Sequence, residues 1–294
     1  MNGKLVILAG GISSRMKKSL SSDNNIDQQL IKDADLKSKA MIRVGENERP
    51  FLDYLLFNAY ESGYREIVIV INEKDHSIKK YYESLNSKKL FPDLLISYVV
   101  QPIPEGREKP LGTADALYNA LKLNINWRGV SFTVCNSDNL YSQFVFKLML
   151  ESKYQNAMID YNRDGLNFEK ERIEKFSVTK KDGEGFLIDI IEKPTVDEIE
   201  SSKDKSGAIG VSMNIFKLNY DMIFPFLEII PLHPIRKEKE LPSAIKMMIV
   251  KFPKSLYAYP VSEEVPDLTS KEDISKVKMY LEKNFPKLSR KEYE

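Results

Sequence analysis

The first strand-like stretch of the chain reads Lys4-Leu-Val-Ile-Leu-Ala-Gly-Gly-Ile-Ser-Ser-Arg-Met16. Its apolar residues 5–8 predict a buried strand that ends at the paired glycines Gly10 and Gly11. Adjacent glycines let the backbone approach a ligand closely and turn its N–H groups toward an anion. Arg15 adds a positive charge, and two hydroxyl side chains precede it, Ser13 and Ser14. The stretch fits a cradle for nucleotide phosphates, although a plain strand–turn–helix corner would use the same letters.

Apolar runs alternate with amphipathic segments through the first half of the chain. The predicted strands are 67–71, 95–100 and 130–135, and the predicted helices are 50–62, 77–85 and 113–121. This alternation is typical of a mostly parallel sheet covered by helices on both faces, a three-layer α/β/α fold of the Rossmann-like kind. Ligands of such folds bind beyond the carboxyl ends of the strands.

The second half of the chain has a different pattern. Its predicted strands are 157–161, 173–179, 186–192 and 210–216. We interpret these strands as antiparallel additions to the same sheet that carry the acceptor pocket. The segment Ser270-Lys-Glu-Asp273 resembles a capping box and predicts an amphipathic last helix. We expect a single domain over 1–294, with a nucleotide-binding half of about 1–140 and an acceptor-binding half of about 141–294.

The polar stretch 17–39 has little periodicity, and we interpret it as a mobile loop that closes over the nucleotide.

Bulk composition argues against several classes of partner. A net charge of +1 gives no field for nucleic-acid binding, and no apolar run approaches the ~20 residues of a membrane helix. The single cysteine, Cys135, suits a reducing compartment, and the start of the chain shows no signal-peptide pattern. We therefore expect a cytoplasmic protein without nucleic-acid or membrane partners.

Two further segments carry residue types that suit a nucleotide. Lys39 precedes a short apolar segment and can hold a phosphate as a point charge, although a solvated lysine explains it more simply. Gln101 follows a strand end, where its amide can both donate to and accept from a base edge. Gly112 lets the backbone approach a flat ring, and Thr113 begins the next helix. An ordinary strand, loop and capped helix would explain the last three residues equally well.

Two aspartates from distant segments can complete a metal site. Asp138 follows the strand 130–135, a common place for a carboxylate that holds Mg²⁺ near phosphates. Asp267 lies in the turn before the last helix. Each alone is explained by a turn or a helix cap. Together they predict a site for Mg²⁺.

These segments, in this order, resemble the sugar-phosphate nucleotidyltransferase family, which includes glucose-1-phosphate thymidylyl-, uridylyl- and adenylyltransferases. The matching segments are Leu8-Ala-Gly-Gly-Ile-Ser-Ser-Arg15, Lys39, Gln101-Pro-Ile-Pro104, Gly112-Thr-Ala114, Asp138, Ile191-Glu-Lys-Pro194, Gly207-Ala-Ile-Gly-Val211 and Asp267 with Glu272-Asp273. Each segment alone is a weak signal, but their shared order along nearly the whole chain is specific. The resemblance implies the nucleotide-diphospho-sugar transferase fold and Mg²⁺-dependent transfer of a nucleotidyl group from an NTP to a sugar 1-phosphate.

The resemblance also implies residue roles. Residues that would contact the nucleotide are Leu8, Ala9, Gly10, Gly11, Ser13, Ser14, Arg15, Lys39, Gln101, Gly112 and Thr113. Residues that would contact the sugar phosphate are Asn139, Glu192, Lys193 and Gly210, and the metal ligands would be Asp138 and Asp267. Arg15, Lys193 and Asp138 would act in catalysis.

Some positions depart from the family pattern, and other functions stay open. Ser13 replaces a glycine, Arg43 stands where proline is usual, and Thr269 replaces the glycine after Asp267.

One alternative function is that of a cytidylyltransferase for a non-sugar phosphate, and another is that of a non-catalytic regulatory protein that binds nucleotide sugars. Gln101 favours UTP or dTTP, although a guanine edge is compatible. The number of subunits is a separate question: the proline-bearing segment 224–234 could form a contact between subunits of a homo-oligomer.

Overall fold

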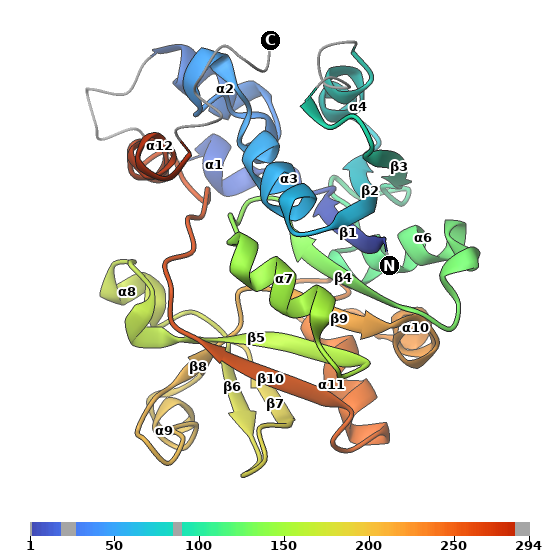
Figure 1. The fold of residues 1–294 in the computed structure, drawn as a ribbon, viewed down its shortest axis with the longest axis vertical. Coiled ribbons are helices and arrows are strands. Elements are labelled where there is room, and N and C mark those ends of the chain that lie inside the picture. Colours follow the sequence, from blue (N-terminus) through green and yellow to red (C-terminus); the bar gives the residue numbers. More distant parts are fainter. Residues whose placement is uncertain (1, 19–27, 85–89, 286–294) are drawn as a thin grey trace.

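Strand β1 (Gly3–Ala9) is the central strand of a parallel group in the sheet (Figure 1). Its two neighbours, β2 (Tyr64–Asn72) and β4 (Ser131–Asn136), both run parallel to it, and β3 (Leu95–Gln101) extends the group beyond β2. Both faces of β1 and β2 are covered, so their apolar, β-branched runs are buried. The computed structural model describes residues 2–18, 28–84 and 90–285.

The strands of the second half join mainly through antiparallel pairs. β9 (Ile215–Asn219) lies between β4 and β5 (Asn156–Asn162) and is antiparallel to both. β10 (Leu256–Val261) returns parallel to β5. The other strands are β6 (Val178–Lys181), β7 (Leu187–Ile191) and β8 (Gly210–Val211). Within the described residues the ten strands form one sheet with the order β3-β2-β1-β4-β9-β5-β8-β6-β7 and with β10 beside β5.

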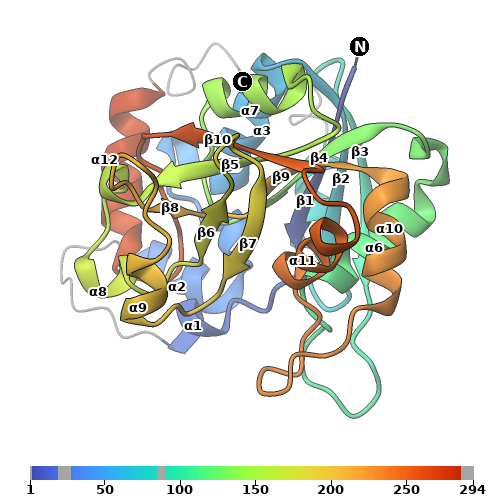
Figure 2. The same ribbon diagram turned by 90° about the horizontal axis from the view of Figure 1, so that it is seen from below.

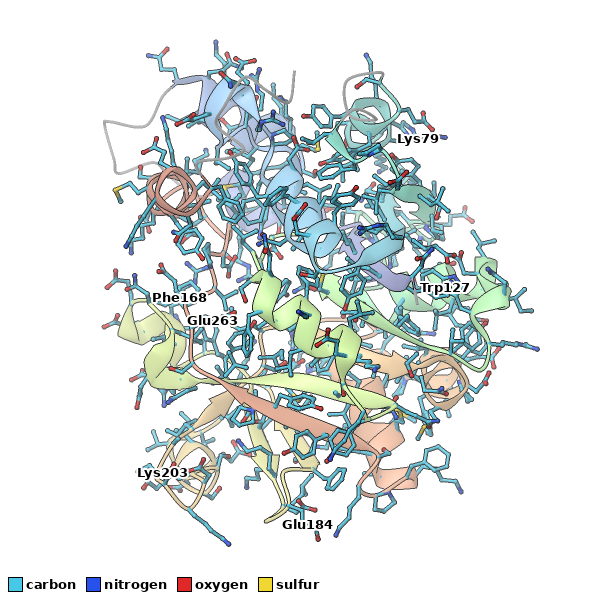
Figure 3. All side chains as sticks on the ribbon, in the orientation of Figure 1. Lys79, Trp127, Phe168, Glu184, Lys203 and Glu263 are labelled. Carbon is cyan, nitrogen blue, oxygen red and sulfur yellow. The ribbon has the colours of Figure 1, made fainter. Side chains whose placement is uncertain are left out.

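Helices cover both faces of this sheet, as Figures 1 and 2 show. On one face lie α3 (Phe51–Glu61) and α7 (Gln143–Glu151); on the other lie α6 (Thr113–Leu123), α10 (Tyr220–Ile229) and α11 (Leu241–Lys251). Each face has its own hydrophobic core. Trp127, labelled in Figure 3, is buried in the α6 core, where its indole N–H donates to Glu66 Oε1 at 2.7 Å. The predicted three-layer fold with a mixed sheet is confirmed.

The remaining helices are α1 (Ser14–Lys18), α2 (Gln28–Leu36), α4 (Ser77–Tyr82), α8 (Lys170–Ile173), α9 (Val196–Glu200) and α12 (Asp273–Asn284). The predicted amphipathic last helix forms, and α12 buries Ile274, Val277 and Leu281. The predicted capping box does not open this helix: the N-cap of α12 is Glu272, which makes no side-chain cap hydrogen bond, and Asp273 Oδ2 instead accepts from Ser270 N at 2.7 Å. In the described part of the chain, no helix combines the length and apolar character needed to cross a bilayer.

Two strand predictions are wrong in their extent. The predicted strand 173–179 begins only at Val178, because α8 and the turn after it occupy the preceding residues. The predicted strand 210–216 is divided into β8 and β9. Asn214 has a left-handed backbone with φ +57°, which bends the chain away from β8 and lets β9 pair with β4.

The interpretation of 17–39 as a mobile loop is wrong for residues 28–36. They form α2, which buries Leu30 and Ala34 against the core. Arg43 fixes this helix, because its Nε donates to the buried Asp33 Oδ2 at 2.7 Å. The departure at Arg43 therefore has a structural use. Residues 19–27 of the predicted loop lie outside the described residues.

Candidate functional site

Polar side chains at the carboxyl ends of β2 and β3 contact the glycine loop. Asn72, at the end of β2, donates through Nδ2 to Gly10 O at 3.0 Å. Gln101, at the end of β3, packs against the same glycine, since a Cβ added to Gly10 would lie 2.7 Å from Gln101 Oε1. Leu8 and Ala9 are buried in β1 directly before this loop. The loop is therefore contacted from the ends of β2 and β3, and a side chain at position 10 would require the Gln101 amide to move.

Ser13 has a left-handed backbone with φ +56°, a conformation that favours glycine. This is the position where the resemblance expects a glycine. Its Oγ accepts a hydrogen bond from Lys39 N at 3.2 Å. Ser14 and Arg15 follow in α1 and are exposed, as is Gly11. The Ser13 hydroxyl thus joins the glycine loop to the segment of Lys39, a contact that glycine could not make.

Lys39 lies beside the predicted metal ligand. Its ammonium group is 2.8 Å from Asp138 Oδ2, and its side chain is only 13% exposed. The solvated lysine that the sequence favoured is therefore not what the structure shows. Lys39 begins a short 3₁₀ turn (Lys39–Met41) whose Ala40 and Met41 are buried, which fixes the backbone that carries the ammonium group.

The two predicted metal ligands are brought together by a short antiparallel contact. Asn139 and Asp267 form an isolated bridge, Leu268 N donates to Asp138 O at 2.9 Å, and Leu140 N donates to Pro266 O at 2.8 Å. Burial and the negative charge of Asp138 raise the pKa of Asp267 to about 6, and the positive charges of Arg172 and Lys39 oppose this shift. The carboxylates of Asp138 and Asp267 are thus close enough to repel each other.

This pair fits Mg²⁺ in chemistry and in number. Carboxylate oxygens are the hard donors that Mg²⁺ prefers, and a divalent cation would relieve the repulsion between them. The structure contains no cluster of three or more potential metal-binding side chains among the residues it describes. Mg²⁺ commonly takes one or two carboxylates and completes its shell with water and substrate phosphates. Asp138 and Asp267 would therefore be its protein ligands.

Arg172 belongs to the site but was not singled out from the sequence. Its Nη2 lies 2.7 Å from Asp267 Oδ2, its Nη1 binds Asp273, and its guanidinium group stands 4.6 Å from the centre of the Phe168 ring. Thr269, in the place of a family glycine, donates from Oγ1 to Asp267 Oδ1 at 2.8 Å. Arg172 lies in a charged stretch with no periodicity, so no local signal marked it.

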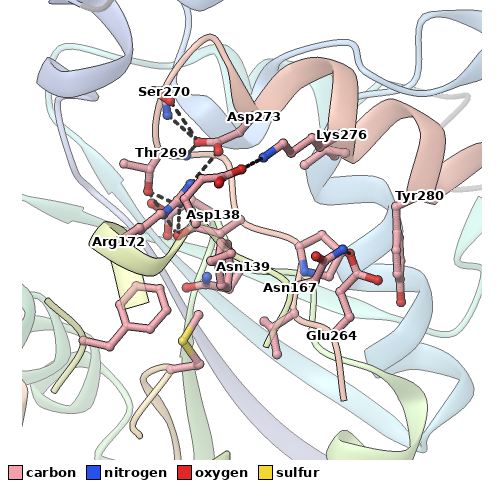
Figure 4. Close-up of a pocket in the computed structure, with 18 of the residues that line it drawn as sticks. Asp138, Asn139, Asn167, Arg172, Glu264, Thr269, Ser270, Asp273, Lys276 and Tyr280 are labelled. Carbon is pink, nitrogen blue, oxygen red and sulfur yellow. Dashed lines mark hydrogen bonds and ion pairs between the residues drawn. The ribbon is translucent and has the colours of Figure 1, made fainter. Parts of the chain in front are cut away.

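A polar cavity of about 970 Å³ opens at this point (Figure 4). Arg15, Asp138, Asn139 and Asp267 line one part of it. Asn139 is itself buried. Helices α8 and α12 supply another wall, which includes Arg172, Lys276 and Tyr280. Four predicted site residues from three separate segments therefore face a single cavity.

The predicted base-binding residues form a second group. Gln101 Nε2 donates to Gly112 O at 2.9 Å. Gly112 has φ +106°, and an added Cβ would lie 2.7 Å from Lys239 O, so a side chain is excluded here. Thr113 Oγ1 accepts from Leu241 N at 3.0 Å and thereby connects α6 to α11. The Thr113 side chain thus serves the fold, whatever its contact with a nucleotide.

The predicted acceptor residues after β7 contact a loop of the second half. The Glu192 carboxylate pairs with Arg236, whose Nη1 lies 2.6 Å from Glu240 Oε1. Lys193 is exposed and has φ +50°. Arg236 was also missed, because it lies in the run Pro234-Ile-Arg-Lys-Glu-Lys-Glu240, whose alternating charges look like solvated surface.

Gly210 lies against a buried ion pair. A Cβ at Gly210 would meet Asp160 Oδ1 at 2.0 Å, and Asp160 binds Thr179 and Lys181 inside the sheet. The lack of a side chain is therefore required by strand packing. Of the described residues, the cavity lining includes neither Gly210 nor the Glu192–Lys193 pair, although Ser212 contributes to it.

The chain matches the family model described as "Nucleotidyl transferase" over residues 34–257. This match excludes the glycine loop and Asp267. Among curated proteins the chain is 25% identical over 230 residues to a glucose-1-phosphate adenylyltransferase of Bifidobacterium animalis subsp. lactis, covering 76% of this chain and 50% of that protein. It is 29% identical over 164 residues to the D-glycero-alpha-D-manno-heptose 1-phosphate guanylyltransferase of Campylobacter jejuni, covering 54% and 60%.

The chain spans about half the length of the first of these relatives. Among solved structures it is similar to a UDP-glucose pyrophosphorylase complexed with UDP-glucose, with a TM-score of 0.70 and 20% identity over 96% of this chain and 99% of the other. A UDP-glucose pyrophosphorylase from Acinetobacter baumannii gives a TM-score of 0.68 at 18% identity, covering 98% and 96%. These structural similarities support the fold. Since the family model covers more than half of the sequence, the chain belongs to the nucleotidyl transferase family.

Proposed function

We propose that this protein transfers a nucleotidyl group from an NTP to a sugar 1-phosphate and releases pyrophosphate. The observation that carries the proposal is the meeting of Asp138 and Asp267 with Arg15 at one polar cavity. Family membership and the printed activities of the adenylyl- and guanylyltransferase relatives support it.

In this reaction an oxygen of the acceptor phosphate forms a bond to the α-phosphorus of the NTP. The bond from that phosphorus to the bridging oxygen breaks, and pyrophosphate leaves with the electron pair. The attacking oxygen is already anionic, so the chain needs no strong general base. Its task is to align the two phosphates and to neutralise their charge.

The negative charge of the phosphates would be neutralised by the glycine loop, by Arg15 and Lys39, and by the metal at the aspartate pair. The amides of Gly10 and Gly11 with the Arg15 guanidinium would hold the departing pyrophosphate. Lys39, placed beside Asp138, would share in this role. Mg²⁺, held by Asp138 and Asp267, would stabilise the charge that develops at the α-phosphate.

The acceptor is proposed to lie on the side of β7 and the cavity. Lys193 would hold its phosphate in line with the α-phosphorus, and Glu192 would orient sugar hydroxyls. Asn139, buried at the cavity, would contact the sugar phosphate. Arg236 already holds Glu192, so it would set the direction of that carboxylate.

The test is pyrophosphate release with Mg²⁺, each of five NTPs (ATP, GTP, CTP, UTP and dTTP), and a pool of sugar 1-phosphates. Release that requires both substrates supports the proposal. A parallel assay replaces the sugar 1-phosphates with choline phosphate or a polyol phosphate, and release only in that assay would favour a non-sugar acceptor. NTP binding without any release would favour a regulatory protein.

Replacing the first aspartate tests the metal role. Asp138→Asn should lower turnover by at least about 100-fold, because an amide is a poor ligand for Mg²⁺ and adds no negative charge. The thermal midpoint should stay close to that of wild type, since the Asp138 side chain is 26% exposed. Wild-type turnover in this variant would contradict the assignment.

A further inference from the structure

The two carboxylates assigned to the metal are already paired with side-chain cations. Asp138 Oδ2 lies 2.8 Å from Lys39 Nζ, and Asp267 Oδ2 lies 2.7 Å from Arg172 Nη2. The Asp267 side chain is only 11% exposed, so water and salt screen this contact weakly. A divalent cation on Asp267 would stand beside the guanidinium group, and the two positive charges would repel each other. Metal binding therefore competes with Arg172 for Asp267.

Arg172 has two further partners that the metal would not take. Its Nη1 pairs with Asp273 (Figure 4), and its guanidinium group stands 4.6 Å from the centre of the Phe168 ring. Asp273 is buried and fixed, because its Oδ2 accepts from two backbone N–H groups of the preceding turn at 2.8 and 2.7 Å. If the contact with Asp267 were lost, Arg172 would stay at the wall of the cavity with its Nη2 free to donate.

The freed donor would lie next to substrate phosphate. Mg²⁺ commonly takes one or two carboxylates and binds substrate phosphates as well, so a phosphate oxygen would become a near neighbour of Asp267 and of Arg172 Nη2. A guanidinium group suits phosphate, because its planar set of N–H donors matches two oxygens at once. Arg15 and Arg172 both line the cavity, one from each half of the chain. A phosphate bound there would meet a guanidinium group from both halves.

We propose that Arg172 is a phosphate-binding residue that Asp267 holds until a divalent cation binds. In the metal-free protein the guanidinium group neutralises Asp267. In the metal-loaded protein Arg172 Nη2 donates to a substrate phosphate while Nη1 stays on Asp273. This inference rests on the proposed function, because it takes Asp138 and Asp267 as the metal ligands and an NTP as the source of the phosphate.

The first test is a titration with Mn²⁺, in which electron paramagnetic resonance measures the free ion, without any nucleotide. Arg172→Gln should bind Mn²⁺ about 5-fold or more tightly than wild type, because Asp267 loses the charged partner that competes with the metal. A variant that had only lost structure would bind Mn²⁺ more weakly, so a gain in affinity cannot come from damage to the fold. The titration is made at pH 8, where Asp267, whose pKa is about 6, is ionised. Equal or weaker binding by Arg172→Gln would overturn the inference.

Lys276→Gln is the matched control for net charge. Lys276 lines the same wall of the cavity, and its ammonium group pairs with Glu169 at 2.9 Å instead of with a predicted metal ligand. This substitution removes one positive charge, as Arg172→Gln does, but leaves the contact with Asp267 in place. Its affinity for Mn²⁺ should stay within about twofold of wild type. A gain as large as that of Arg172→Gln would assign the effect to net charge and would overturn the inference.

The second test measures phosphate binding by the metal-loaded protein. Inorganic pyrophosphate is titrated by calorimetry in saturating Mn²⁺, so that the result does not depend on the base. Its dissociation constant should rise about 5-fold or more in Arg172→Gln and should change less than twofold in Lys276→Gln. Unchanged pyrophosphate binding in Arg172→Gln would show that Arg172 only competes with the metal and would refute its role toward phosphate.

Failure of this inference can be told apart from failure of the proposed function. Tighter Mn²⁺ and weaker pyrophosphate binding by Arg172→Gln, without pyrophosphate release from any NTP by wild type, would contradict the transfer reaction and leave the inference standing. Efficient transfer by wild type, with Mn²⁺ affinity unchanged in Arg172→Gln, would do the reverse. Mn²⁺ binding that survives in both Asp138→Asn and Asp267→Asn would overturn the metal assignment and the inference together.

Discussion

Ser13 shows how one side chain can replace a glycine at a cost. Its left-handed backbone, φ +56°, is unfavourable by about 1 kcal/mol or more for a residue with a Cβ. The hydrogen bond from Lys39 N to Ser13 Oγ, at 3.2 Å, offsets this cost. The backbone strain and the hydrogen bond can be separated by two substitutions.

Ser13→Ala should lower the free energy of unfolding by about 1 kcal/mol, because the hydrogen bond is lost and the backbone strain stays. Ser13→Gly also loses the bond but relieves the strain, so its stability should be close to that of wild type. Urea unfolding of the three proteins measures both effects. Equal destabilisation by Ala and Gly would show that strain at this position is unimportant.

Asp53 is a buried carboxyl group away from the proposed site. It accepts from Tyr81 Oη at 2.9 Å and from Tyr82 Oη at 2.7 Å, and Arg49 Nη1 lies 3.7 Å away. Burial raises the pKa of Asp53 from 3.8 to about 6, and these hydrogen bonds and the charge of Arg49 oppose the shift. At pH values between these two pKa values, the folded protein binds more protons at Asp53 than the unfolded chain does. The stabilising contribution is therefore complete below about pH 4 and is lost as the pH rises through about 6.

Asp53 should thus make the free energy of unfolding about 1 kcal/mol lower at pH 7 than at pH 5. Asp53→Asn cannot titrate, so its loss of stability between these pH values should be smaller by that amount. Asp267, with a pKa also near 6, contributes in the same direction in both proteins and cancels in the comparison. Denaturant unfolding at the two pH values is the measurement. An unchanged pH dependence in the variant would contradict the pKa assignment.

At the scale of elements, strand β8 depends on the close approach of Gly210 to Asp160 in β5. Gly210→Ala places a Cβ 2.0 Å from Asp160 Oδ1, which forces the two strands apart and disturbs the buried pair with Lys181. This substitution should lower the free energy of unfolding by more than about 2 kcal/mol.

Gly183→Ala is the matched control, because a Cβ there meets nothing within 4 Å. Its thermal midpoint should stay within a degree or two of wild type. If Gly210→Ala were equally well tolerated, the packing role of Gly210 would be refuted, and a contact of its backbone with sugar would become the better explanation for the glycine.

At the scale of the whole molecule, the two halves named from the sequence share one sheet. β9 of the second half lies between β4 and β5. The loops 103–112 and 231–240 extend side by side in Figure 2, and Arg107 Nη2 donates to Lys237 O at 2.7 Å. Without β9 of the second half, the β4 edge of the nucleotide-binding half would be unpaired.

We therefore expect a single calorimetric unfolding transition for the full chain. A fragment of residues 1–140 should lack a cooperative transition of its own, because it has neither β9 nor the helices that cover α6. Two well-separated transitions, or a cooperatively folded fragment, would contradict the expectation of one domain over 1–294.

Much of the fold could be predicted because its signals are local. The apolar runs of β1 to β5 and the amphipathic pattern of α3, α6 and α12 have periods that a short window of sequence contains. The predictions failed where a few residues decided the outcome. The left-handed backbone at Asn214 divides one predicted strand, and the pairing of Arg43 with Asp33 orders a segment that looked like a loop.

The sequence by itself determined the alternation of strands and helices, the glycine loop and the presence of Asp138 and Asp267. Only the tertiary structure decided which groups meet. It pairs Asp138 with Asp267 through a bridge between distant segments, and it fixes the Gln101 amide between Gly112 and Asp115. It also brings Arg172 and Arg236 to acidic residues far away in the chain. The physical reason is that periodicity and glycine conformation depend on neighbouring residues, whereas the partner of a side chain depends on how the whole sheet brings strand ends and loops together.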